Sequence, residues 1–224
     1  MIGKLFIVAT PIGNLSDITL RALETLKSAD AILCEDTRVT AKLLARYQIQ
    51  KPLVACHEHT DDRKLTQIIG RLEKGENLAF VTDAGTPGMS DPGNKLVSFA
   101  VAAAVPIVPI PGVSALSALV SVAGIDMREF VFLGFPPHKK GRQTFFKSVA
   151  VSEIPNIYYE SPHRVMKNLE LLSEYAPEIR VVIGRELTKL FEEIIRGTIG
   201  EAREYFAAHP EKIKGEFVII AYKD

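Results

Sequence analysis

The chain has little cysteine and no long apolar run. Its two cysteines, Cys34 and Cys56, lie far apart in the 224 residues and outside any paired-cysteine spacing. Neither a disulfide framework nor a zinc site is therefore predicted. No uninterrupted apolar stretch reaches the length of a bilayer span, and Pro11 interrupts the apolar start too early for a signal peptide. We expect a cytoplasmic protein that does not enter a membrane.

The chain also lacks an excess of charge of either sign. Lysine plus arginine and aspartate plus glutamate are balanced at 27 each, within a composition that is 47% hydrophobic and 24% charged. Affinity for nucleic acid normally rests on a basic surface, so a neutral chain is not an obvious nucleic-acid binder. Any polynucleotide substrate must be held by a local basic patch.

Short apolar runs alternate with helical patterns in the first half of the chain. This alternation predicts a parallel sheet with crossover helices. After about residue 120 the strand candidates become longer and several alternate, which predicts an α+β domain with a mixed or antiparallel sheet and fewer helices. We therefore expect an α/β fold with an N-terminal domain at residues 1–122 and a C-terminal domain at 123–224, and a ligand cleft between them.

The segment Val81–Gly93, VTDAGTPGMSDPG, stands between a buried strand and a helix. It contains three glycines, two prolines and two aspartates. Glycine lets a ligand approach the main chain, and proline stiffens the path between such points. Asp91 and Pro92 are predicted to begin the following helix as its N-cap and first residue. Loops at the carboxyl ends of parallel strands are where open α/β sheets bind ligands.

The details of this segment narrow the ligand. The lysine and hydroxyl residue of a phosphate-binding loop are absent, since Met89 and Ser90 follow Gly88, and the first strand-to-helix turn offers a single glycine, Gly13. These absences favour a nucleoside without phosphates, with Asp83 as acceptor for its hydrogen bonds. Asp83 stabilising only its own turn is an equally good interpretation. A second loop, Pro109–Leu119, follows the next strand and also combines proline and glycine with the start of a helix. The presence of two such loops favours the nucleoside site.

Six motifs occur in a fixed order from near the first residue almost to the last: VATPIGNLSDITLRA, CEDTR, VTDAGTPGMSDPG, PIPGVSAL, YYESPHR and GRELTK. In this order they resemble the tetrapyrrole methylase superfamily and, within it, the ribosomal small subunit methyltransferase I subfamily. The resemblance implies a two-domain methyltransferase, usually a homodimer, that binds S-adenosylmethionine between its domains. It also implies 2′-O-methylation of a cytidine ribose in 16S ribosomal RNA of the small ribosomal subunit.

The resemblance further implies the residues that contact the cofactor. From the N-terminal loops these are Pro11, Asp83, Gly85, Thr86, Pro87, Ser90, Val113, Ser114 and Ala115. From the second domain they are Tyr159, Leu187, Gly215 and Glu216. Backbone contacts are expected to dominate.

The expected reaction needs a base or a cation near the attacking hydroxyl, because a ribose hydroxyl is weakly acidic. The candidates are Glu35, Asp36 and Arg38 in CEDTR and Arg185, Glu186 and Lys189 in GRELTK. Among these we expect Asp36, Arg38, Glu186 and Lys189 to be catalytic, and Glu35 and Arg185 to contact substrate. Asp36 as a helix cap with a solvated Arg38, and Arg185 with Glu186 as a cross-strand pair, are the structural alternatives.

RNA contacts are predicted in the basic segment PPHKKGRQTFFK, where Lys139, Lys140 and Arg142 suit phosphates. Its phenylalanines, Phe145 and Phe146, are better read as core residues. His163 and Arg164 are either helix-start residues or phosphate ligands. His57 and His59 share a face if extended, but without a third ligand at a recognised spacing we expect no metal there.

Two other functions remain open from the sequence. One is a tetrapyrrole C-methyltransferase, which requires a roomy cleft lined by groups that bind carboxylates. The other is a non-catalytic RNA-binding or assembly protein that has kept the fold. Methyl transfer to small ribosomal subunits, methyl transfer to a tetrapyrrole, or the absence of cofactor binding distinguishes the three possibilities.

Overall fold

A computed structural model describes residues 1–224 as two compact units, Met1–Ser114 and Ala115–Asp224. The break lies one short helix before the junction expected after residue 122, because α5 (Ala115–Ser121) packs within the second unit. None of the helices combines the length and the apolar character that a membrane span requires.

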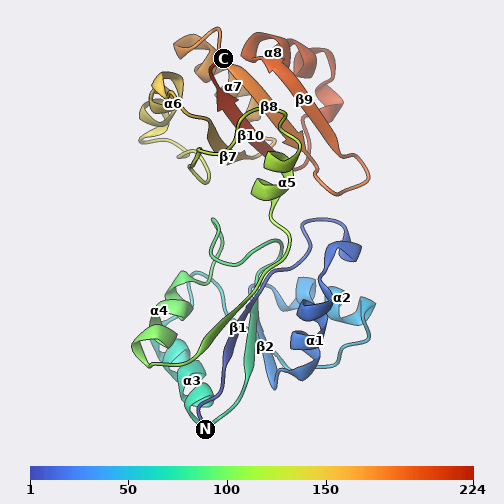
Figure 1. The fold of residues 1–224 in the computed structure, drawn as a ribbon, viewed down its shortest axis with the longest axis vertical. Helices are drawn as coiled ribbons and strands as arrows, with labels where there is room; N and C mark the ends of the chain where they lie inside the picture. The colour runs from blue at the N-terminus through green and yellow to red at the C-terminus, as the bar shows by residue number, and fades with distance from the viewer. The chain divides into compact units, whose positions relative to one another are not determined.

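The first unit is built around a parallel sheet in the order β3-β2-β4-β1-β5 (Figure 1). Its strands are β1 (Leu5–Val8), β2 (Ala31–Cys34), β3 (Leu53–Ala55), β4 (Leu78–Val81) and β5 (Ile107–Ile110). Its helices are α1 (Leu20–Ser28), α2 (Thr37–Arg46), α3 (Asp62–Glu73) and α4 (Asn94–Ala102), with a 3-10 turn at Leu15–Asp17. The predicted alternation of strands and helices in a parallel sheet is confirmed, with a later start for α4.

Helices cover both faces of this sheet. Leu26 of α1 and Leu44 of α2 pack on one face, and Leu65 of α3 and Leu96 of α4 pack on the other. Every residue of β2 and β4 is buried, as expected for central strands of a parallel sheet. Burial holds the central strands in place between the two layers of helices. Because the strands are parallel, the polar residues that follow β2, β3 and β4 all lie at the carboxyl edge of the sheet.

The second unit contains a mixed sheet in the order β6-β7-β10-β8-β9. Its strands are β6 (Val131–Phe132), β7 (Asn156–Glu160), β8 (Arg180–Arg185), β9 (Glu193–Thr198) and β10 (Phe217–Tyr222). Only β6 and β7 pair in parallel, while the other pairs are antiparallel. The predicted combination of a parallel-sheet domain and a mixed-sheet α+β domain is confirmed.

The second unit has more helices than the sequence indicated. Three of them, α6 (Arg142–Val151), α7 (Val165–Tyr175) and α8 (Ile199–Ala208), cover one face of the sheet, and a 3-10 turn lies at Pro210–Lys212. The N-cap residues of α6 and α7, Gly141 and Arg164, form no side-chain capping bond. Without a polar cap, the sequence gives little sign of where these two helices begin.

Candidate functional site

The loops that follow β1, β4 and β5 are joined at the carboxyl edge of the parallel sheet. Thr10 and Gly85 exchange two backbone hydrogen bonds of 2.9 and 3.0 Å. The Thr86 hydroxyl donates to the carbonyl of Val113 at 3.1 Å. Three of the predicted cofactor residues, Gly85, Thr86 and Val113, are thus brought together within the first unit.

The glycine-rich loop, Asp83–Gly93, ends later than predicted. Helix α4 begins at Asn94 with Gly93 as its N-cap, so the expected cap at Asp91 with Pro92 in the first turn is wrong. Gly93 has φ of 132°, and a Cβ there would lie 2.7 Å from the ring of Phe80. The close approach of the backbone to this buried ring requires glycine, and the chain can therefore enter the helix only after Gly93.

Four residues that follow β2, β3 and β4 form what we call the edge cluster: Glu35, Asp36, His57 and Asp83. Cys34 pairs in register with Ala55 and with Val81, so the residues after these three positions leave the sheet side by side. The backbone N–H of Asp36 donates to Asp83 Oδ1 at 3.1 Å across 47 positions. Asp83 therefore links two loops of the sheet edge.

The carboxylates of the edge cluster differ in their ionisation. Burial raises the pKa of Glu35 and the charge of Asp83 raises it further, against the lowering influence of the Asp83 backbone N–H and of His57. The hydrogen bonds from Arg38 lower the pKa of Asp36 to about 2. Of the two, Glu35 is better suited to accept a proton near neutral pH.

Asp36 has the structural role that the sequence left open. It is the N-cap of α2 and accepts the backbone N–H of Arg38 at 2.8 Å. The Arg38 side chain is 86% exposed and pairs with Asp36 at 2.6 Å. The geometry accounts for both residues as the beginning of a helix.

A cavity of about 500 Å³ borders the glycine-rich loop on the side of α3 and α4. It is lined by segments 56–60 and 90–96, including His57, Glu58 and Lys95. Lys95 Nζ donates to the carbonyl of Thr60 at 3.1 Å and pairs with Asp62 at 2.7 Å. The rings of His57 and His59 are 6.4 Å apart, and no group of three or more side chains suited to a metal is present.

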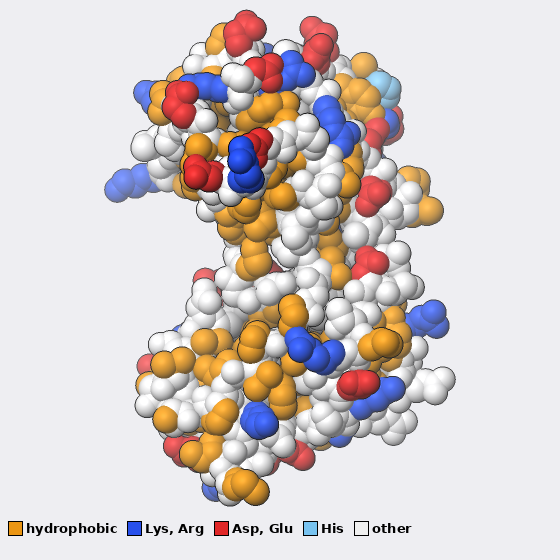
Figure 2. Space-filling model, in the orientation of Figure 1, with side chains coloured by type: hydrophobic (Ala, Val, Ile, Leu, Met, Phe, Trp, Pro, Cys, Tyr) orange, Lys and Arg blue, Asp and Glu red, His pale blue; other side chains and the backbone are white.

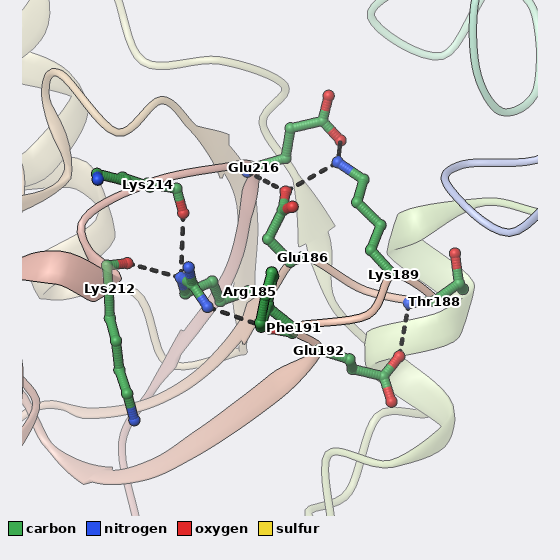
Figure 3. A network of polar contacts seen from close by, with 9 residues as sticks. All are labelled: Arg185, Glu186, Thr188, Lys189, Phe191, Glu192, Lys212, Lys214 and Glu216. Carbon is green, nitrogen blue, oxygen red and sulfur yellow. Dashed lines mark hydrogen bonds and ion pairs between the residues drawn. The ribbon is translucent and has the colours of Figure 1, made fainter.

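In the second unit three residues of GRELTK and one residue before β10 form what we call the loop cluster (Figure 3). Its members are Arg185, Glu186 and Lys189 from the motif, and Glu216. Lys189 Nζ lies 2.8 Å from Glu186 Oε1 and 3.0 Å from Glu216 Oε2. The same Glu186 oxygen accepts the backbone N–H of Glu216 at 2.9 Å. Lys189 is therefore shared as the ion-pair partner of both glutamates.

These contacts set the ionisation of the loop cluster. Burial opposes the ionised form of Glu186, but the bonds from Lys189 and from the Glu216 backbone outweigh it and lower the pKa of this carboxyl. Burial likewise opposes the charge of Lys189, and its bonds to the two glutamates outweigh it and raise the pKa of the ammonium group. Neither group is suited to receive a proton near neutral pH.

Arg185 is enclosed in backbone. Its guanidinium donates to the carbonyls of Lys212 at 2.6 Å, Lys214 at 3.0 Å and Phe191 at 3.1 Å (Figure 3). The residue is 8% exposed, and these contacts take the place of the cross-strand pair with Glu186 that was the structural alternative to a substrate contact. Gly215 belongs to the same structure: its φ is 87°, and a Cβ there would lie 2.3 Å from the Glu186 carboxylate.

The YYESPHR residues are also held by internal bonds. The Glu160 side chain is fully buried and pairs with Arg164 at 3.2 Å. Arg164 also donates to the carbonyl of Pro136 at 2.9 Å, whereas His163 is exposed. In the basic segment His138, Lys139 and Lys140 are exposed, Phe146 is fully buried and Phe145 packs against the core, as predicted for the two phenylalanines.

Several residues of these clusters were missed by sequence reasoning. Thr10 ends the apolar run of β1 and its hydroxyl donates to the carbonyl of Thr82, which only the sheet order brings close. His57 was considered as a metal ligand and not as a neighbour of Glu35. Glu160 is a charged residue at the end of an apolar strand, β7. Such a residue in the sequence indicates a buried ion pair.

Comparison with known proteins identifies the family. The model of the family of tetrapyrrole (corrin/porphyrin) methylases matches residues 4–203. The chain belongs to this family.

The curated relatives are more specific. Proteins named ribosomal RNA small subunit methyltransferase I are 44% identical in Neisseria meningitidis serogroup B, 44% in Borrelia garinii subsp. bavariensis and 43% in Hydrogenobaculum. These matches cover 98%, 96% and 99% of this chain and 76%, 97% and 96% of the relatives. This member of the tetrapyrrole methylase family is therefore a methyltransferase of the ribosomal RNA small subunit methyltransferase I type.

Solved structures agree on the fold. Cobalt precorrin-4 methyltransferase, a cobalamin biosynthetic enzyme, matches with a TM-score of 0.72 at 19% identity over 98% of this chain and 94% of that one. A putative diphthine synthase from Entamoeba histolytica matches with a TM-score of 0.71 at 15% identity over 99% and 93%. The same architecture is thus found in enzymes named for different substrates, so the fold alone does not identify the acceptor.

Proposed function

We propose that the protein transfers the methyl group of S-adenosylmethionine to the 2′-hydroxyl of a cytidine in 16S ribosomal RNA of the small ribosomal subunit. The observation that carries this proposal is the 43–44% identity, over nearly the whole chain, to proteins named ribosomal RNA small subunit methyltransferase I. The choice of a cytidine ribose rests on the resemblance of the six sequence motifs.

The loops of the first unit fit the proposed cofactor. The glycine-rich loop holds Gly85, Gly88 and Ser90 at positive φ. Gly85 ties the loop to Thr10 through both of its backbone groups, while the turns at Gly88 and Ser90 leave that part of the loop accessible to a ligand. Asp83 is exposed and supplies a carboxylate for ribose hydroxyl groups. Pro11, Thr86, Pro87, Val113 and Ser114 complete the proposed contacts in this unit, and Ala115, Tyr159, Leu187, Gly215 and Glu216 are those proposed in the second.

The chemistry asked of the chain is modest. S-adenosylmethionine, when bound, supplies an already activated methyl group on a sulfonium. The protein then has to orient the acceptor hydroxyl, exclude water and remove one proton. Glu35 is the proposed proton acceptor, because its pKa is raised while those of Asp36 and Glu186 are lowered.

The other predicted catalytic residues receive supporting roles in this proposal. Asp36 and Arg38 hold the start of α2, next to Glu35, and Glu186 and Lys189 hold the loop cluster. Lys139, Lys140, Arg142 and His163 are the proposed RNA contacts, whereas Arg164 and Arg185 act through the backbone they hold. We further propose that the protein acts in the cytoplasm as a homodimer, which light scattering of the purified chain tests.

Methyl transfer from radiolabelled S-adenosylmethionine tests the proposed function. The acceptors are small ribosomal subunits from a strain without the enzyme, the naked RNA from those subunits, and a mixture of tetrapyrroles. We expect label in the RNA, recovered after alkaline hydrolysis in a dinucleotide, because a 2′-O-methyl group blocks cleavage at the modified ribose. Label in a base would correct the acceptor atom, label only in a tetrapyrrole would replace the proposal, and no cofactor binding would overturn it.

A further inference from the structure

The segment Phe130–Val151 has an excess of positive charge in an otherwise neutral chain. It contains four lysine and arginine residues and no aspartate or glutamate, against 27 residues of each sign in the whole chain. On the face shown in Figure 2, blue and red side chains are scattered over both units. A local cationic surface of this kind attracts a polyanion.

An aromatic cluster is formed in part by residues that shortly precede the cations in the chain. The ring of Phe135 is 5.3 Å from that of Tyr159, and the ring of Phe132 is 5.1 Å from Tyr159 on another side. Tyr158 faces the helices and belongs to the core, so Tyr159 lies on the opposite face of β7. Phe135 is 52% exposed, which leaves much of its surface open to a partner.

The backbone on both sides of Phe135 is anchored. The carbonyl of Gly134 accepts the backbone N–H of Tyr159 at 2.9 Å. The carbonyl of Pro136 accepts Nη1 of Arg164 at 2.9 Å, and Arg164 is held in turn by the buried Glu160. The ring is therefore presented by a fixed stretch of chain, which reduces the entropy lost when a ligand binds.

We propose that Phe135 is a stacking site for an unpaired base of single-stranded RNA, whose neighbouring phosphates are held by Lys139, Lys140 and Arg142. Aromatic rings beside a cationic groove are how proteins hold unpaired nucleotides. Five residues span at most about 18 Å, so Lys139 and Lys140 remain within reach of the few nucleotides next to a base stacked on Phe135. The choice of RNA over DNA rests on the proposed function.

This proposal changes the role of two sequence predictions. The stacking ring is Phe135 and not Phe145 or Phe146, which lie in or against the core. Arg164 is a positioning residue, because its guanidinium is directed to Glu160, Ser161 and Pro136. It fixes the loop that carries the phosphate contacts.

Equilibrium binding of the full chain to a fluorescent single-stranded RNA, measured by anisotropy at several salt concentrations, tests the proposal. A stacked base contributes about 1–3 kcal/mol, so Phe135→Ala should weaken binding roughly 5- to 150-fold with an unchanged salt slope. The double variant Lys139→Ala with Lys140→Ala should reduce the slope by about 1.4, near 0.7 for each phosphate contact of a single strand. Phe135→Trp should retain affinity.

The matched control is Phe191→Ala, which removes a phenylalanine that is 68% exposed but followed by Glu192 and Glu193. It should bind RNA like the wild type. Equal affinity of the Phe135→Ala and Phe191→Ala variants, or equal binding of a duplex and a single strand, would overturn the stacking site. Loss of S-adenosylmethionine affinity in Phe135→Ala by calorimetry would also overturn it and assign the ring to the cofactor. Because this assay needs no methyl transfer, failure of the proposed reaction leaves its result interpretable.

Discussion

The edge cluster holds three carboxylates and a histidine but no lysine or arginine, whereas the loop cluster holds two glutamates beside a lysine and an arginine. In the edge cluster Glu35 has a raised pKa and Asp83 as a carboxylate neighbour. In the loop cluster every charge has a partner in the chain, and the pKa of Glu186 is lowered while that of Lys189 is raised. Because perturbed pKa values are found at functional sites, the comparison favours the edge cluster over the loop cluster as the place of proton transfer.

The sharpest test of this comparison is Glu35→Gln. Removal of a general base costs about 10²- to 10⁴-fold in kcat, and we expect a loss in this range with little change in cofactor affinity. In the wild type kcat should fall as the pH drops through the raised pKa of Glu35, because the protonated carboxyl accepts no proton. Rate profiles against pH for both proteins measure this, and an acid limb that persists in Glu35→Gln would assign the proton to another group.

The next largest effect is expected for Arg185→Met. The substitution leaves three backbone carbonyls without their donor in a nearly buried position, which should lower the free energy of unfolding by about 3 kcal/mol. Arg196→Met is the control, since Arg196 also donates to backbone carbonyls, those of Val122 and Ala123, but is exposed to water. If urea unfolding is unchanged while RNA affinity falls, Arg185 contacts substrate after all.

Substitutions of Asp36 test whether this residue acts as a helix cap or as a catalytic residue. Asp36→Ala should lower the free energy of unfolding by about 1 kcal/mol through loss of the α2 N-cap, and Asp36→Asn should retain almost all of it. Both variants should keep kcat within a few-fold of the wild type, in steady-state assays run at saturating substrate. A large loss of kcat in the stable asparagine variant would restore Asp36 to the catalytic group.

The smallest effect is expected for Lys189→Met. Partly exposed ion pairs contribute about 0.2–1 kcal/mol, and the loss should be of this size at neutral pH. The stabilisation of a carboxyl with a lowered pKa is present above its unfolded value and disappears as the pH falls through the folded value. The difference in thermal unfolding between wild type and variant should therefore fade below about pH 4, the ordinary range of glutamate. A kcat reduced a hundredfold without a change in unfolding would contradict this assignment.

The first unit follows closely from its sequence. Burial of every residue in β2 and β4 produces uninterrupted apolar runs, and the intervening helices α1, α2 and α3 have Thr19, Asp36 and Asp61 as caps. Local signals and tertiary packing agree there, so the periodicity is readable. The start of α4 is the exception, because the contact between Gly93 and Phe80 comes from packing that no local pattern displays.

The site was less predictable than the fold. The motifs indicated which residues gather at strand ends, but Arg164 and Arg185 also bind the backbone carbonyls of Pro136, Lys212 and Lys214, which lie 27 to 29 positions away. A side chain that binds such a carbonyl leaves no signature in residue type. The sequence therefore offered Arg164 as a helix-start residue or a phosphate ligand and Arg185 as a substrate contact, although the structure directs both side chains inward.

The two cysteines give the first unit a built-in reporter. Cys34 and Cys56 are both buried free thiols with raised pKa, and the second unit contains no cysteine. Because the thiolate is the reactive form, both should be silent towards thiol reagents in the folded protein. The rate of labelling then reports the opening of the parallel-sheet unit alone, and slower labelling with S-adenosylmethionine present would show directly which unit the methyl donor stabilises.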